Sequence, residues 1–262
     1  MAAVGERQIS YDARGLAEPN AEVPKVSEVD GAKAVFDARD LTTRQINLEL
    51  RWLLYEQGVT DVTVKNPGSK HSIGVGILTR CKITFEGSLG YFGCGLIDGP
   101  EIHITGRVGW SACENMMSGV VVIEGNAGSL TGAALRGGDL VVKGRVGARS
   151  GIDQKGGTII TLGSAGSMNG FMMQRGRQVI CGDVGPGLGD SMYDGIMYVG
   201  GRVKSLGIDC VEGEWTDADA EFIERKFRIY GLGSPPEFQK FVCGKKLYNY
   251  DNLEPSERKL VL

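Results

Sequence analysis

Glycine-rich loops, histidines and cysteines are the residues of this 262-residue chain that invite a chemical interpretation. The stretch "GYFGCGLIDG" (residues 90–99) has the glycine density of a phosphate-binding loop, but no helix-forming segment follows it and the GxxxxGK[ST] pattern is missing. The two histidines, His71 and His103, have no cysteine at a metal-ligand spacing. The chain also lacks a local signature of a Ser-His-Asp nucleophile. We therefore expect no catalytic, cofactor-binding or metal-binding residue in this chain.

Composition and cysteine use narrow the class of protein further. Six cysteines are scattered without a CxxC pair, which predicts reduced thiols that pack as small apolar side chains. The net charge of −3 gives no basic surface for nucleic acid. There is no uninterrupted apolar run of about 18 residues and no signal-peptide pattern in "MAAVGERQIS". These features predict a cytoplasmic protein that binds neither membranes nor nucleic acid.

Glycine is the compositional outlier, with 41 of 262 residues, and its positions recur with a nineteen-residue period without insertion. Seven units fit between Pro67 and Val199, with a remnant that ends near Gly207. The second position of the unit is Gly87, Gly106, Gly125, Gly144, Gly163 and Gly182, and the fifth is Gly90, Gly109, Gly128, Gly147, Gly166 and Gly185. We interpret these glycines as structural turn residues that tolerate positive φ and allow neighbouring turns to approach closely.

The apolar positions of the unit predict the fold. Its seventeenth and nineteenth positions, such as Ile102 and Ile104, are apolar in most units and two residues apart, which places both on one face of a strand. The twelfth position, from Leu78 onward, is expected to face inward as well. Such a short unit has no room for a helical crossover, so successive units must stack as coils. The sequence predicts an all-β fold, a right-handed parallel β-helix of about seven coils with flanking α-helices.

The eighteenth position faces outward by alternation, yet its middle members are β-branched and apolar. We expect this face to be covered by the flanks of the chain or by a partner protein. The residues assigned to a candidate partner interface are Val122, Val141, Ile160, Phe238, Phe241 and Tyr248. On this hypothesis, charged residues at Val141 and Ile160 would weaken assembly and leave the isolated fold intact.

The segments outside the repeat divide the chain into four parts. Residues 1–36 are expected to form an extended arm, and residues 37–66 a capping helix followed by a strand that leads into residues 67–207, the β-helix. The capping helix begins at Thr42 or Thr43 and ends at Gly58. Residues 208–262 are expected to form helices and a tail: one helix from Thr216 to Gly231, and a second capped by Ser234.

The coils, together with "TTRQIN" and "VTVKNPGSKHSIGVGI", resemble the C-terminal GXGXG β-helix domain of the glutamate synthase large subunit over about residues 37–210. The tail "EFQKFVCGKKLYNY" is most similar to that of the separate β-helix subunits of N-methylglutamate synthase and related complexes. The resemblance implies a scaffold subunit that is not itself catalytic. Its implied partners are a glutaminase-like amidotransferase subunit and an FMN-dependent glutamate synthase-like subunit that also carries an iron–sulfur cluster. The implied reaction of the complex makes N-methylglutamate from methylamine and glutamate.

Two other interpretations remain open from the sequence. The third subunit of formylmethanofuran dehydrogenase, and of the related formyltransferase/hydrolase complex, has similar glycine-rich coils. The chain could alternatively be a solitary binding or carbohydrate-active β-helix, which would need an aromatic-lined polar groove. The carboxylates of the repeat argue against a carbohydrate-cleaving site, because charges of both signs are mixed along the columns.

Overall fold

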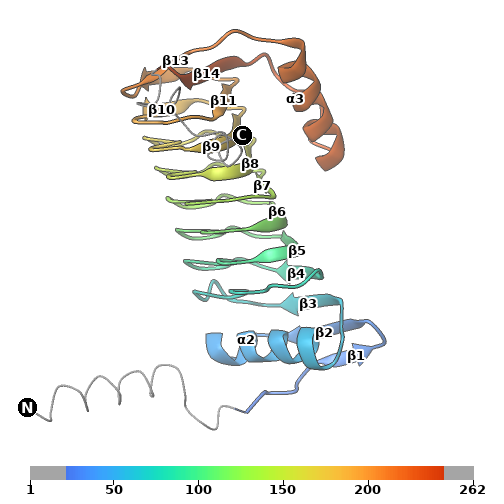
Figure 1. Ribbon diagram of the computed structural model, residues 1–262. Helices are drawn as coiled ribbons and strands as arrows, with labels where there is room; N and C mark the ends of the chain where they lie inside the picture. The colour runs from blue at the N-terminus through green and yellow to red at the C-terminus, as the bar shows by residue number, and fades with distance from the viewer. Residues whose placement is uncertain (1–21, 245–262) are drawn as a thin grey trace, which may run out of the picture.

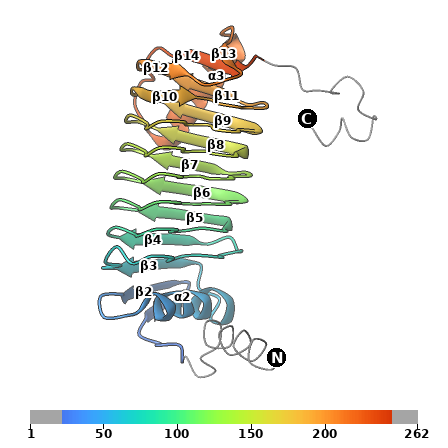
Figure 2. The same ribbon diagram turned by 90° about the vertical axis from the view of Figure 1, so that its left-hand side faces the viewer.

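The computed structural model describes residues 22–244, which wind through about eight turns of a parallel β-helix (Figures 1 and 2). Successive turns add parallel strands to one long sheet, in the order in which they occur along the chain. These strands are β2 (Lys33–Asp37), β3 (Asp61–Lys65), β4 (Lys82–Glu86), β5 (Asp98–Ile104), β6 (Ser118–Ile123), β7 (Asp139–Val142), β8 (Lys155–Thr161), β9 (Arg175–Ile180) and β11 (Ile196–Val199). The predicted parallel β-helix with flanking helices is confirmed.

The register of the sheet follows the sequence repeat and deviates at the turn between β3 and β4. Ile104 pairs with Phe85 and with Ile123, which lie one repeat period before and after it. Phe85 pairs with Val64, which is two positions farther away than one period. The longer turn between β3 and β4 shifts its loop by one position, so Ile77 fills the interior. Leu78, which the repeat assigns to the interior, is 65% exposed. The inward assignment of Leu78 is wrong for this reason.

A second row of backbone pairing closes each coil on the other side. Single parallel bridges connect Leu89, Val108, Ala127, Val146, Ala165 and Val184 in turn. The row ends as a two-stranded sheet of β10 (Val184–Leu188) and β12 (Val203–Leu206). The side chains of both rows fill one continuous interior, because the inward members of β3 to β9 and most of the bridge residues are buried.

The turn glycines of the repeat are needed mainly for close stacking. A Cβ added to Gly125 would lie 2.8 Å from the carbonyl oxygen of Gly106 in the preceding coil, and φ at Gly125 is not positive. Among the twelve predicted turn glycines, only Gly87 has a positive φ, at 142°. Left-handed backbone instead occurs at other columns, for example at Gly138, where φ is 78°. Most of these positions therefore require glycine because the neighbouring coil is too close for a Cβ, and not because φ is positive.

The first end of the β-helix is covered by a helix. Helix α2 (Thr43–Arg51) begins with a capping box between Thr42 and Gln45 and continues into the π-helical turn η1 (Trp52–Glu56). Ile46, Leu50 and Leu53 are fully buried against the first coils, as the apolar spacing predicts. Strand β1 (Glu28–Asp30) pairs antiparallel with β2, and β2 is itself the first parallel strand. The predicted extended arm is therefore wrong for residues 28–36, and the β-helix begins at residue 33 rather than at residue 67. Residues 1–21 of the predicted arm and residues 245–262 of the predicted tail lie outside the described residues.

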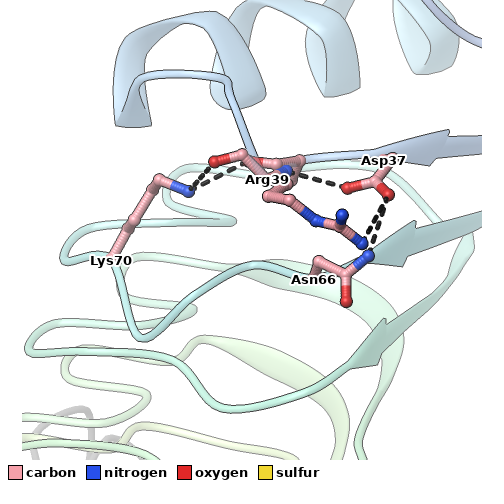
Figure 3. Close-up of polar contacts among 5 residues, drawn as sticks. Asp37, Arg39, Asn66 and Lys70 are labelled. Carbon is pink, nitrogen blue, oxygen red and sulfur yellow. Dashed lines mark hydrogen bonds and ion pairs between the residues drawn. The ribbon is translucent and has the colours of Figure 1, made fainter.

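Polar contacts tie the loop after β2 to the first coil (Figure 3). Lys70 donates hydrogen bonds to the carbonyl oxygens of Ala38 and Arg39, at 2.9 and 3.1 Å. Asn66 donates to the carboxylate of Asp37 at 2.8 Å. The backbone amide of Arg39 also donates to Asp37, and this bond is the main reason why the pKa of Asp37 is lowered.

The other end of the sheet is closed by two antiparallel strands, β14 (Gln239–Cys243) and β13 (Cys210–Glu212). The predicted second C-terminal helix, capped by Ser234, is wrong because this segment forms β14 between β11 and β13. The other predicted helix is confirmed as α3 (Asp217–Tyr230), which has Thr216 as N-cap and ends at Gly231. In Figure 1, α3 descends beside the later coils, away from the closed end. Within residues 22–244, no helix combines the length and the apolar character needed to cross a lipid bilayer.

Candidate functional site

The outward-facing residues at the centre of the long sheet form a column, and residues 22–244 cover only part of its length. We call this set the outer column: Thr63, Thr84, His103, Val122, Val141, Ile160, Val179 and Tyr198. The last four residues are completely buried, and the first four are partly exposed. We call these parts the covered half and the open half.

Helix α3 packs an apolar stripe against the covered half. Phe222, Ile223 and Phe227 form a second buried cluster with the covered half, on the outside of the β-helix. The guanidinium of Arg177, on β9, lies 4.4 Å from the ring centre of Phe222, at a distance typical of a cation–π contact. Burial of these side chains, at about 1.5–3 kcal/mol each, is the main contribution that holds α3 on the sheet.

Polar contacts fix both ends of α3. At its first turn, Asp219 accepts hydrogen bonds from Tyr198 at 2.6 Å and from Lys240 at 2.8 Å. Burial alone would raise the pKa of Asp219, but the hydrogen bonds from Lys240, Tyr198 and the cap residue Thr216 lower it overall. Since Tyr198 belongs to β11 and Lys240 to β14, this carboxylate joins the helix to the closed end of the sheet.

In the last two turns of α3, Lys226 and Tyr230 converge on Asp139, the first residue of β7. Lys226 Nζ lies 2.7 and 2.5 Å from the two carboxylate oxygens, and the Tyr230 hydroxyl donates to one of them. The side chains of Lys226 and Asp139 are only 14% and 16% exposed. Burial, and next the Asp139 carboxylate, raise the pKa of Tyr230, so its hydroxyl stays protonated as the donor.

These contacts correct the predicted partner interface. Val141 and Ile160 lie under α3 of the same chain, and Phe241 is buried in the interior, so none of the three is available to a partner. Phe238 is partly buried against Phe227, at 6.3 Å between ring centres. Val122 is the member of the predicted set that lies in the open half. Tyr248 is outside the described residues.

Three residues of the open half, Thr84, His103 and Val122, line a groove that begins where α3 ends. This groove has a volume of about 480 Å³. Its walls include Lys82, Thr84, Glu101, His103, Val120, Val122, Glu124, Ile229 and Tyr230. A second hollow of about 600 Å³ shares Lys82, Glu101 and Val120 with it and extends to Ala32 on the first turn. The two hollows therefore form one groove along the earlier coils.

A charged cluster borders the groove on the side where the strands end. Glu124 Oε1 lies 2.8 Å from His103 Nε2 and 2.9 Å from Lys143 Nζ. The hydrogen bond from Lys143, and after it that from His103, lowers the pKa of Glu124. On the opposite side, Lys82 and Glu101 face each other at 3.8 Å, and both side chains are about two-thirds exposed.

Three aromatic rings form an exposed stack that the sequence analysis missed. The ring centres of His71 and Tyr91 are 4.5 Å apart, and those of Tyr91 and Trp110 are 5.3 Å apart. In both pairs the ring planes are nearly parallel. Tyr91 and Trp110 are one repeat period apart, and this spacing was a usable signal for their stacking. The step from His71 to Tyr91 is one position longer than the repeat, because the turn between β3 and β4 is irregular, so the period did not indicate the third ring.

The buried cysteine side chains offer no activated thiol. Burial raises the pKa of Cys94 to about 12 and those of Cys81, Cys181 and Cys210 to about 11. Thiols with such pKa values carry almost no thiolate near neutral pH, and the thiolate is the nucleophilic form. No disulfide joins any of the six cysteines, all of which lie in the described part of the chain. Within residues 22–244, no group of three or more His, Cys, Asp or Glu side chains is placed to hold a metal ion.

Comparison with known proteins gives partial relatives. No protein-family model matches the chain. Protein GlxC of Rhizobium meliloti (strain 1021) is 40% identical over 68 residues, which cover 24% of this chain and 29% of GlxC. The similar region thus spans less than a third of that relative. The formyltransferase/hydrolase complex FhcABCD of Methylorubrum extorquens, solved with methylofuran, contains a chain that aligns with a TM-score of 0.46 and 22% identity, over 58% of this chain and 67% of that one.

Proposed function

We propose that this chain is a scaffold subunit, not itself catalytic, of a glutamate-synthase-type complex, and that the complex is an N-methylglutamate synthase. The main support for the proposal is the partial cover of the outer column. The β-helix presents a long row of stacked strands, and the described part of the chain covers only part of that row with its own helix. A rigid rod with an open face is suited to hold other subunits in place.

The coil sequence and the chemistry of the side chains support the same proposal. The glycine-rich coils resemble those of the glutamate synthase β-helix domain, and a 68-residue stretch is 40% identical to Protein GlxC. The buried thiols have raised pKa values, which fits a chain that leaves the reaction to its partners. On this proposal, FMN and an iron–sulfur cluster belong to the synthase-like partner, and glutamine hydrolysis belongs to the amidotransferase-like partner.

Purification of the tagged chain from its native cells tests the proposal. We expect two further subunits at fixed stoichiometry, flavin absorbance in the complex, and formation of N-methylglutamate from methylamine and glutamate. Flavin-free partners that act on formyl groups would replace this proposal with the formyltransferase/hydrolase alternative. A chain that elutes as a monomer without partners would favour the solitary binding protein.

A further inference from the structure

The way in which α3 lies on the sheet sets the dimensions of a covering helix. Its contacts run from Asp219 against β11 to Tyr230 against β7, so this part of the helix crosses three strand spacings. Eleven helical steps of about 1.5 Å span about 16 Å, and three spacings of about 4.8 Å span about 14 Å. Helix α3 therefore runs along the stack of coils, as Figure 1 shows.

The open half repeats this geometry, and no helix within residues 22–244 covers it. It comprises β6, β5, β4 and β3, which again make three spacings, or about 14 Å. Val122, His103, Thr84 and Thr63 continue the column that α3 covers farther along. At the junction, Ile229 in the last turn of α3 is 59% exposed and lines the groove.

The charges beside the column are also arranged alike. Asp139, which receives Lys226 of α3, pairs in the sheet with Val120, and Val120 pairs with Glu101. Glu101 thus occupies the position of Asp139 two coils earlier. Its own contact, with Lys82 at 3.8 Å between exposed side chains, is a weak surface pair. Glu101 is therefore available to a cation on an incoming helix.

We infer that the open half is the docking site for an amphipathic helix of a partner subunit, which continues the line of α3 along the coils. The helix needs about ten residues to span the open half, an apolar stripe that contacts Val122, Val120 and Ile229, and a lysine or arginine that pairs with Glu101. This inference rests on the proposed function, because it assigns a surface to one of the proposed subunits. The proposed partner surface therefore lies next to the surface that α3 covers and does not overlap with it.

Photo-crosslinking within the purified complex tests the inference. A benzophenone amino acid replaces Thr84 or His103 in the open half, and Trp110, on the exposed aromatic stack, serves as the control position. We expect crosslinks from positions 84 and 103 to residues three or four apart in one helix of a partner subunit. An assembled complex without crosslinks from the open half, or with crosslinks to a strand, a loop or a second copy of this chain, overturns the inference and leaves the proposed function intact. If no complex assembles, the proposed function fails, and this inference fails with it.

A second test compares partner binding by two charge-reversal variants, one at Glu101 and one at a control position. Glu101→Lys is expected to weaken partner binding by about tenfold or more, whereas Glu114→Lys, on the turn before β6, is expected to change it by less than about twofold. Thermal unfolding of each free variant checks that the fold is retained. Equal binding by the two variants would exclude Glu101 as the partner of the incoming cation.

Discussion

The covered and open halves of the outer column lie on successive parallel strands of one sheet, but they differ in their outward side chains and in what lies above them. Val141, Ile160, Val179 and Tyr198 are completely buried under α3, and Val122, one coil earlier, is partly exposed. The inward residues of the strands are buried in both halves, and the buried residues of α3 pack on the outer column and not in the interior. The difference teaches that the coils provide a rigid row, and that separate helices decide which part of the row remains accessible.

The largest expected difference in folding stability is between an aspartate placed in the covered half and one placed in the open half. Ile160→Asp places a carboxylate under α3, where an unpaired buried charge costs about 4 kcal/mol. Val122→Asp introduces the same group in the open half, where water reaches it, and should cost less than about 1 kcal/mol. Urea unfolding of the free chain measures both values. Similar losses at the two positions would mean that the open half is covered in solution.

The next prediction concerns a feature that the two halves share. Gly157, beside the covered half, has φ of 65°, and an added Cβ would lie 2.7 Å from the Gly138 carbonyl oxygen. Gly119, beside the open half, has φ of 104°, and its Cβ would lie 2.3 Å from the Pro100 carbonyl oxygen. Alanine at either position should cost about 3 kcal/mol, because a strained φ and a backbone clash add together.

The control for this pair is Gly31→Ala. Gly31 also has a positive φ, of 58°, but nothing lies within 4 Å of the added Cβ, so a loss of about 1 kcal/mol is expected. A tolerant Gly119 beside an intolerant Gly157 would show that the earlier coils are loosely stacked. In that case the two halves would differ in how tightly their coils stack, and not only in whether α3 covers them.

The elements that the sequence predicted correctly are those fixed by local patterns. The nineteen-residue register and the alternation of inward side chains specify stacked coils, since each coil repeats the contacts of its neighbour. Helix α2 and helix α3 follow from their capping residues and apolar spacing. The misplaced Leu78 shows the limit of this reasoning, because the longer turn between β3 and β4 shifts the loop without breaking the glycine spacing.

The site depends on contacts that local patterns do not contain. Lys226 and Asp139 are far apart in the sequence, and nothing in either segment indicates that they pair. The segment after Ser234 has the local features of a helix start, but β11 offers it an open edge, and pairing with that edge makes it β14. The sequence could therefore predict that the outer column is covered, but not that α3 covers only half of it.

A smaller effect is expected on acidification, and it should arise in the covered half. The folded-state pKa of Asp219 is lowered, so its contribution to stability is present above its unfolded pKa of about 4 and is lost as the pH falls below that value. The free energy of unfolding should fall by about 2 kcal/mol. Urea unfolding as a function of pH measures it, with Asp219→Asn as the control. The difference in stability between the two proteins should shrink below about pH 4, and a difference that is independent of pH would contradict the role of this carboxylate.

The smallest expected effect comes from the equivalent carboxylates of the two halves. Glu101→Gln removes one partner of an exposed pair with Lys82, so the free chain should lose less than about 0.5 kcal/mol. Asp139→Asn removes the charge that Lys226 and Tyr230 contact, in a site that is mostly buried, and should cost about 2 kcal/mol. Both are carboxylate-to-amide changes on one column of the same sheet, so the helix above is the main difference between them. Denaturant unfolding of the isolated chain distinguishes the two values. If Glu101→Gln is as costly as Asp139→Asn, a segment of the chain itself already covers Glu101, and the open half would have no room for a partner helix.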